Sequence, residues 1–217
     1  MIVKICGIKD LAAMDAALEA GADMVGLVFF PASPRNVTPA EATNLAARAR
    51  GKAKIVALSV DADDTLIDAI EASIAPDLHQ VHGSESVSRM REIAGRTKKQ
   101  VMKALPVADA SDLAPLASYE AVADWILFDA KAPKDATRPG GHGQTFDWSL
   151  LKNVKHAKPV MLSGGINPAN VAQAIETVRP DAVDVSSGVE SALGVKDREK
   201  IFAFVRNARN AVMERAS

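Results

Sequence analysis

Short apolar runs alternate with longer amphipathic segments along the whole chain. Eight runs rich in Val, Ile, Leu or Met begin near Ile2, Met24, Lys54, Leu78, Gln100, Asp124, Pro159 and Ala182. Each run is brief and is bounded by Gly, Pro or Asp, which is typical of buried parallel strands. The pattern predicts eight strands joined by helical connections.

The connecting segments carry helix start and stop signals. Asp10 can cap a helix over residues 11–20, and Gly21 follows it. Thr38 begins a capping box with a proline at the first helical position. Asn167 and Pro168 are expected to start a helix over residues 169–178 by the same means.

Eight strand–helix units in 217 residues predict a (β/α)8 TIM barrel, a single α/β domain over residues 1–217. The alternative is a doubly wound open sheet, but the turn after the first run lacks the Gly-x-Gly-x-x-Gly pattern of that fold. The connections after the second and sixth runs are the longest. In a barrel, extra length after a strand lies on the face where active sites are built.

Side chains of a strand alternate in direction, which orients the first run. Val3 and Ile5 are expected to face the helices. Lys4 and Cys6 then face the barrel interior, with Cys6 nearest the upper rim. The direction of Lys103 in the fifth run stays open.

Three further polar residues reach the same rim by the same alternation. They are His82, Asp129 and Asp184, at the ends of the fourth, sixth and eighth strands. Alone, a buried cysteine, a capping aspartate or a backbone-bonded histidine is ordinary. Together at one rim they favour a functional site.

Two glycine-containing turns follow the seventh and eighth runs. The first contains Gly164 and Gly165, and the second contains Ser187 and Gly188. Barrels of this kind frequently hold a phosphate between these two loops, where free backbone N–H groups meet the anion. The pair of turns predicts a small phosphorylated ligand.

Composition narrows the class of protein. Lys and Arg total 26 against 27 for Asp and Glu, which gives no electrostatic reason for binding nucleic acid or a membrane surface. The single cysteine fits a reducing compartment. No apolar run approaches the ~20 residues that span a bilayer. We therefore expect a cytoplasmic protein.

Seven motifs, spread from the first strand to the last, resemble those of the phosphoribosylanthranilate isomerase family of tryptophan biosynthesis. They are KICGI at 4–8, GLVFFPASPRNV at 26–37, QVHG at 80–83, FDA at 128–130, PGGHGQTFDW at 139–148, LSGGINPANV at 162–171 and VDVSSGVES at 183–191. The family usually has threonine where His142 stands, which leaves the substrate contact of that loop open.

The resemblance implies an Amadori rearrangement of a phosphosugar–anthranilate substrate, without a metal or an organic cofactor. It implies that Cys6 is the general base and Asp129 the general acid. Arg35 would bind the anthranilate carboxylate, and the two glycine turns the phosphate. His82 and Asp184 would orient other groups or contact sugar hydroxyls. The oligomeric state could be monomer or homodimer.

Three alternatives remain at this point. A related histidine-pathway isomerase catalyses the same rearrangement, but it has an aspartate where Cys6 stands. Indole-glycerol-phosphate synthase has a longer chain with an N-terminal helical extension. A non-catalytic phosphosugar-binding barrel has no reason to keep both an inward thiol and an inward carboxylate. We also expect Lys4 to lower the pKa of Cys6, because a nearby cation favours the thiolate.

Overall fold

The computed structural model describes residues 1–133, 136, 139–141, 143 and 145–213. His142, which the sequence analysis singled out, lies outside these residues.

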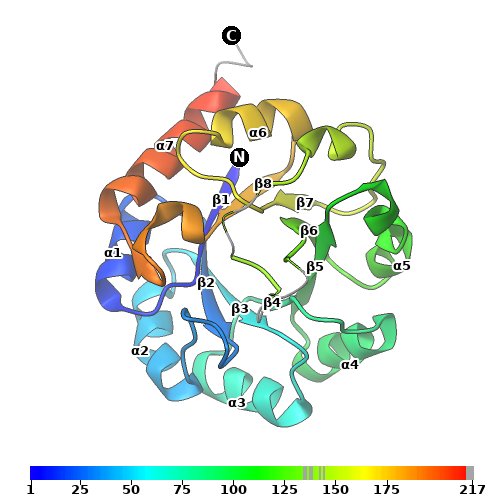
Figure 1. Cartoon of the computed structure of the whole chain (residues 1–217). Helices are drawn as coiled ribbons and strands as arrows, with labels where there is room; N and C mark the ends of the chain where they lie inside the picture. The colour runs from blue at the N-terminus through cyan, green and yellow to red at the C-terminus, as the bar shows by residue number, and fades with distance from the viewer. Residues whose placement is uncertain (134–135, 137–138, 142, 144, 214–217) are drawn as a thin grey trace.

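Eight parallel strands close into a barrel, seen along its axis in Figure 1. Closure is completed by the last strand, which pairs with the first along Ile2–Ala182 and Lys4–Asp184. This confirms the (β/α)8 prediction and excludes the open sheet. The strands are β1 Ile2–Cys6, β2 Met24–Phe29, β3 Lys54–Ser59, β4 Leu78–Val81, β5 Gln100–Val107, β6 Trp125–Ala130, β7 Val160–Leu162 and β8 Ala182–Val185.

Helices surround the barrel in chain order (Figure 1). The α-helices are α1 Leu11–Glu19, α2 Pro39–Ala49, α3 Asp64–Ile74, α4 Val87–Thr97, α5 Leu116–Glu120, α6 Val171–Val178 and α7 Arg198–Met213. Short 3-10 helices are η1 Ala110–Leu113, η2 Trp148–Leu151 and η3 Ser187–Val189. A two-stranded hairpin, β9 Glu190–Ala192 and β10 Val195–Lys196, follows η3.

The expected helix caps are confirmed for α1 and α2. The Asp10 side chain accepts from the Ala13 backbone N–H, and Thr38 and Glu41 form the reciprocal capping box. The expected start of α6 is wrong. Asn167 instead accepts from the backbone of Ala169 within a turn, and the helix begins only at Val171.

Alternation along the strands divides the buried side chains into two layers. The outer layer, between strands and helices, includes Val3 and Ile5. The inner layer fills the lower barrel with apolar side chains, among them Met102 and Ala104. Lys103 therefore points outward. The inner-layer residues are Met24, Val56, Leu78, Met102, Ala104, Trp125, Leu127, Met161 and Ala182.

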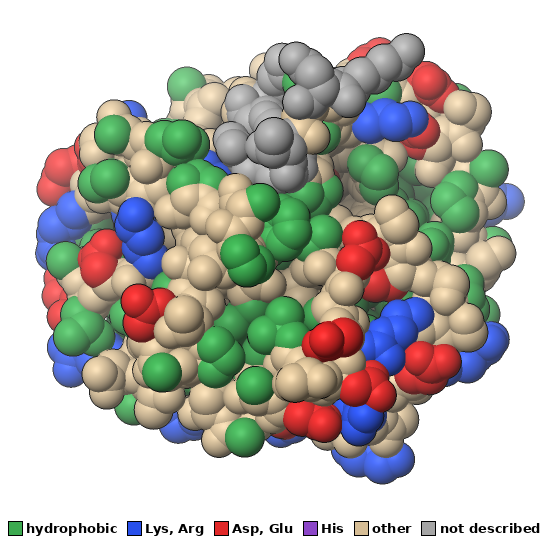
Figure 2. All heavy atoms as spheres, turned by 60° about the horizontal axis from the view of Figure 1, so that its bottom comes forward, with side chains coloured by type: hydrophobic (Ala, Val, Ile, Leu, Met, Phe, Trp, Pro, Cys, Tyr) green, Lys and Arg blue, Asp and Glu red, His purple; other side chains and the backbone are tan. Residues whose placement is uncertain are grey.

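The surface carries no dominant charge. Figure 2 shows acidic and basic side chains interspersed over one face, with hydrophobic side chains gathered near its middle. Among the described residues, none of the helices combines the length and the apolar character needed to cross a membrane.

Candidate active site

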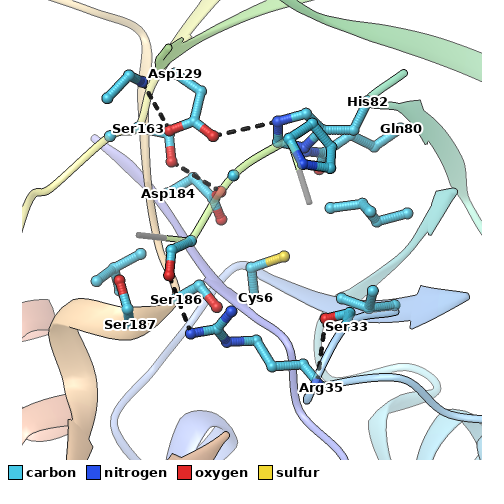
Figure 3. A pocket seen from close by; sticks show the side chains of 18 of the residues that line it. Cys6, Ser33, Arg35, Gln80, His82, Asp129, Ser163, Asp184, Ser186 and Ser187 are labelled. Atoms are coloured by element: carbon cyan, nitrogen blue, oxygen red, sulfur yellow. Dashed lines mark hydrogen bonds and ion pairs between the residues drawn. The ribbon is translucent and has the colours of Figure 1, made fainter. Parts of the chain in front are cut away.

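A pocket opens at the carboxyl ends of the strands and encloses about 790 Å³ of space continuous with solvent. Figure 3 shows side chains from β1, β4, β6 and β8, and Ser163 just after β7, converging on it. Of the predicted site residues, Gly188 alone does not line the pocket. Those that line it are Cys6, Arg35, His82, Asp129, Gly164, Gly165, Asp184 and Ser187.

Cys6 presents a buried thiol to this pocket. The neighbouring strand must carry Gly26 here, because a Cβ at that position would lie 2.7 Å from the Cys6 Sγ. Burial raises the pKa of the thiol, and Asp184 adds to that effect. Lys4 and Lys196 act in the opposite direction. The expected influence of Lys4 is present, but burial outweighs it, so the net pKa is raised.

Lys4 is fully buried beneath the pocket and is held by two oxygen atoms. Its Nζ donates to Gln80 Oε1 at 2.8 Å and to Asp184 Oδ1 at 2.9 Å. Burial, the largest single influence, lowers the pKa of Lys4, but the charges of Asp184 and Cys6 and their hydrogen bonds together outweigh it, and the pKa is raised. Asp184 accepts a further hydrogen bond from Ser163 at 3.3 Å. The floor of the pocket is therefore a paired cation and anion.

Asp129 faces His82 across the pocket rim, with Oδ2 lying 3.2 Å from Nε2 (Figure 3). Gln80 determines the histidine tautomer. Because Gln80 Oε1 accepts from Lys4, its amide nitrogen faces His82 Nδ1, at 3.4 Å. Nδ1 is then an acceptor, so the ring proton lies on Nε2, the nitrogen nearer to Asp129.

The loop after β6 covers the Asp129 carboxylate. A Cβ at Gly140 would lie 2.5 Å from Asp129 Oδ2 and 3.1 Å from the ring of His82. Only glycine permits this approach. The long connection predicted to contribute to the site therefore does so.

Arg35 is buried, and its charge is already paired. Its Nε and Nη2 donate to the two carboxylate oxygens of Glu190 at 2.7 and 2.9 Å. Glu190 also accepts from Lys196 at 2.9 Å. Sequence reasoning missed Glu190 and Lys196, because charges in a short glycine-containing turn are usually exposed. Spacing alone gives no sign that both side chains fold inward.

The two glycine turns lie against each other. Gly164 and Gly165 have φ angles of +82° and +67°, which side-chain-bearing residues rarely adopt. A Cβ at Gly188 would lie 2.1 Å from the carbonyl oxygen of Ile166. Gly188 therefore joins the two turns, whereas Gly164, Gly165 and Ser187 face the pocket.

No group of three or more His, Cys, Asp or Glu side chains within the described ranges is arranged to hold a metal ion. The groups that can act here transfer protons: a thiol, a carboxyl and an imidazole around one pocket. The fold and site define a (β/α)8-barrel enzyme of the acid–base class.

Comparisons with known proteins narrow this class. Residues 3–207 match the family model for N-(5′-phosphoribosyl)anthranilate (PRA) isomerase. The chain is 58% identical over 207 residues to the N-(5′-phosphoribosyl)anthranilate isomerase of Rhodopseudomonas palustris, covering 95% of each chain. It is 55% identical over 211 residues to that of Afipia carboxidovorans, covering 97% of this chain and 90% of the relative.

Comparison with solved structures indicates the same family. The phosphoribosyl anthranilate isomerase of Thermotoga maritima superimposes with a TM-score of 0.88 at 38% identity, covering 97% of this chain and all of that one. A phosphoribosyl anthranilate isomerase in complex with reduced 1-(o-carboxyphenylamino)-1-deoxyribulose 5-phosphate has a TM-score of 0.83 at 35% identity, with the same coverage. The chain belongs to the phosphoribosylanthranilate isomerase family, the isomerases of tryptophan biosynthesis. The resemblance predicted from the motifs is confirmed.

Proposed function

We propose that this chain converts N-(5′-phosphoribosyl)anthranilate to 1-(2-carboxyphenylamino)-1-deoxyribulose 5-phosphate, with Cys6 as general base and Asp129 as general acid. The observation that carries the proposal is that both side chains line one pocket. Family membership and the reduced ligand held by a solved relative support the choice of substrate.

Asp129 acts first. Its carboxyl group protonates the furanose ring oxygen, and the C1′–O bond opens to give a Schiff base. His82 Nε2 lies 3.2 Å from one carboxyl oxygen and restricts how the group can turn. The backbone N–H of Ala130 donates to the other oxygen at 2.9 Å. Held from both sides, the carboxyl group is oriented for one proton transfer.

Cys6 acts second. Its thiolate removes the proton from C2′, and the resulting enolamine tautomerises to the aminoketose. The thiol must ionise first, and burial disfavours that. The buried cations Lys4 and Lys196 offset part of this cost. The two cations make a lone thiol usable as a base.

Binding groups occupy the rest of the pocket wall. Arg35 binds the anthranilate carboxylate through the guanidinium N–H groups that Glu190 does not engage. The turn of Gly164 and Gly165 and the turn of Ser187 and Gly188 hold the phosphate through backbone N–H groups. Asp184 and His82 contact sugar hydroxyls or orient their neighbours.

The wider setting follows from the same chemistry. Residues 1–217 act as one domain, because one barrel supplies every group named above. A free thiol that must ionise to work suits the reducing cytoplasm. We expect the barrel to be a monomer or a homodimer, and sedimentation at several protein concentrations distinguishes the two.

The test is the turnover of two site variants with freshly prepared phosphoribosylanthranilate, followed by loss of anthranilate-type fluorescence. Cys6→Ser keeps the shape but raises the pKa of the base, so kcat falls at least about hundredfold. Asp129→Asn removes the transferable proton, so kcat falls at least about as much. A reaction without enzyme corrects for spontaneous hydrolysis of the substrate.

Asp124→Asn is the matched control for Asp129→Asn. The Asp124 carboxylate also accepts a backbone N–H, that of Val101 at 2.9 Å, but it precedes β6 at the opposite end of the barrel. This variant should keep its turnover. Near-normal turnover of Cys6→Ser or Asp129→Asn would remove the role given to that residue.

A further inference from the structure

Three buried charged side chains form a cluster beside the pocket. Arg35, Glu190 and Lys196 are almost entirely excluded from solvent, with side chains at most 5% exposed. Arg35 lines the pocket, whereas Glu190 and Lys196 stand behind it. Proteins rarely bury three charges in one place without a specific use for them.

Glu190 connects the other members of this cluster. One oxygen accepts from Arg35 Nε at 2.7 Å and from Lys196 Nζ at 2.9 Å. The other accepts from Arg35 Nη2 at 2.9 Å and from the Gly194 backbone N–H at 3.1 Å. Both carboxylate oxygens are therefore satisfied, and the Glu190 side chain cannot turn without breaking several hydrogen bonds.

The carboxylate determines how the Arg35 guanidinium is turned. The bidentate contact uses the Nε–Nη2 edge of the guanidinium plane. The opposite side faces Gly141, where a Cβ would lie 2.5 Å from Nη1. Gly141 lines the pocket, and Figure 3 shows the guanidinium beside Ser186 and Cys6. Nη2 also donates to the Gly141 carbonyl oxygen at 3.5 Å, so the side of the guanidinium that Glu190 does not engage lies beside a residue that lines the pocket.

Packing holds the stem of Arg35 equally firmly. A Cβ at Gly7 would lie 2.5 Å from Arg35 Cδ, so the stem lies directly against the backbone that follows Cys6. The β9–β10 hairpin closes the other side, because a Cβ at Gly194 would lie 2.7 Å from the Pro34 carbonyl oxygen. Lys196 then ties the hairpin to the Ser186 carbonyl at 2.9 Å.

We propose that Glu190 is a positioning residue that sets specificity for the aromatic carboxylate of the substrate, because it holds the Arg35 guanidinium in the orientation that binds this group. The inference rests on the proposed role of Arg35. It assigns Glu190 no contact with the substrate. Its effect on ligand binding belongs to recognition of the anthranilate portion and not to the phosphate.

The experiment compares two ligands that differ in this portion. The reduced rearranged product carries the aromatic carboxylate, whereas ribose 5-phosphate lacks it. Glu190→Gln should raise the inhibition constant of the reduced product, and the KM for phosphoribosylanthranilate, at least about tenfold. The inhibition constant of ribose 5-phosphate should stay within about twofold.

Glu85→Gln is the matched control. Glu85 is equally buried and pairs with Lys103 at 2.7 Å, but it does not line the pocket. Both Gln variants should lower the melting temperature, because each leaves a buried cation less well paired. Only Glu190→Gln should change the ratio of the two inhibition constants. If Glu190→Gln fails to fold, Glu190→Asp keeps the charge and should shift the ratio in the same direction.

Each contrary result points to a different error. Wild-type protein that does not turn over phosphoribosylanthranilate would contradict the proposed function itself. Arg35→Met with an unchanged KM would remove the role of Arg35. If Arg35→Met raises KM but Glu190→Gln leaves the inhibition ratio unchanged, or weakens both ligands equally, Glu190 is only a structural counter-ion and this inference is wrong.

Discussion

Cys6 is a buried thiol whose reactivity depends on the charged side chains around it. Burial raises its pKa, Lys4 and Lys196 act against that rise, and Asp184 adds to it. Lys4 is the larger of the two cationic influences and donates to Asp184 at 2.9 Å. Removing the charge of Lys4 beneath the pocket should therefore change the pKa of the Cys6 thiol measurably.

Lys4→Met tests this dependence. Without the ammonium group the thiolate loses its largest favourable interaction, so the pKa of Cys6 rises further. The limb of the pH–rate profile on which activity increases with pH should move to higher pH, and activity at neutral pH should fall. The measurement is kcat/KM across pH 6 to about 10, within the ordinary titration range of a thiol.

Lys103→Met is the control for Lys4→Met. Lys103 is also a buried, paired lysine, but it lies on the outer face of β5 against Glu85. Its removal should cost stability and leave the pH–rate profile in place. A Lys4→Met profile that coincides with the wild-type profile would show that Lys4 does not act on Cys6.

Which side chains enter the pocket was predictable wherever strand alternation applies. Cys6, Asp129 and Asp184 lie on strands with apolar neighbours. Because side chains alternate between the two faces of a strand, the sequence determines that these three face the barrel interior. Glu190 and Lys196 lie in a short hairpin after η3. Their inward direction depends on ion pairs with a residue far away in the chain, which no local pattern encodes.

At the scale of elements, the turns after β7 and β8 act as one unit. The Gly188 backbone lies against the Ile166 carbonyl oxygen, where a Cβ would come within 2.1 Å. Because both groups are backbone, there is no flexible side chain that could move aside to make room for a Cβ. The spacing of the two turns, and with it the proposed phosphate site, depends on the absence of a side chain at residue 188, which is glycine.

Gly188→Ala should force the two turns apart. Because the phosphate is proposed to bridge them, the inhibition constant of inorganic phosphate should rise at least about tenfold, as expected when charge-assisted hydrogen bonds are lost. Gly95→Ala in α4 is the control, since a Cβ there meets nothing within 4 Å. That helical substitution should stabilise the protein by about 0.5–1 kcal/mol. Unchanged phosphate inhibition in Gly188→Ala would place the phosphate elsewhere.

Strand positions were predictable because buried parallel strands are short, continuous apolar runs between turn residues. Helix starts were predictable where a cap precedes an apolar stripe, as at Thr38. Two expectations failed. Asn167 forms a turn instead of a cap, and the described part of the β6–β7 connection contains η2 where an α-helix was expected. Residues 152–158 there are mostly polar or basic, so they lack an apolar stripe to pack.

At the scale of the whole molecule, the first and last strands of the barrel meet at the site. β1 pairs with β8, and the hairpin after β8 packs onto the loop after β2. Burial opposes ionisation of Glu190, but the hydrogen bond from Arg35 and the charge of Lys196 outweigh it and lower its pKa to about 2. The ion pairs by which this carboxylate joins distant parts of the chain therefore depend on pH.

Acid should remove the stabilisation that Glu190 provides. The pKa is lower in the folded protein than the ordinary value of 4.5, so the stabilisation is complete above pH 4.5 and is lost as the pH falls through about 2. The difference in free energy of unfolding between the wild type and Glu190→Gln should be smaller at pH 3 than at pH 7. Urea unfolding at both pH values measures it, and an equal difference would contradict this linkage.

Closure of the barrel by its first and last strands also bears on when the enzyme becomes active during its synthesis. Cys6 leaves the ribosome well before β8, Glu190 and Lys196 do. A nascent chain that ends before Lys196 has a thiol without its second cation and an Arg35 without its anchor. The chain must therefore be translated through Lys196 before catalysis can begin, and chains that end earlier are inert.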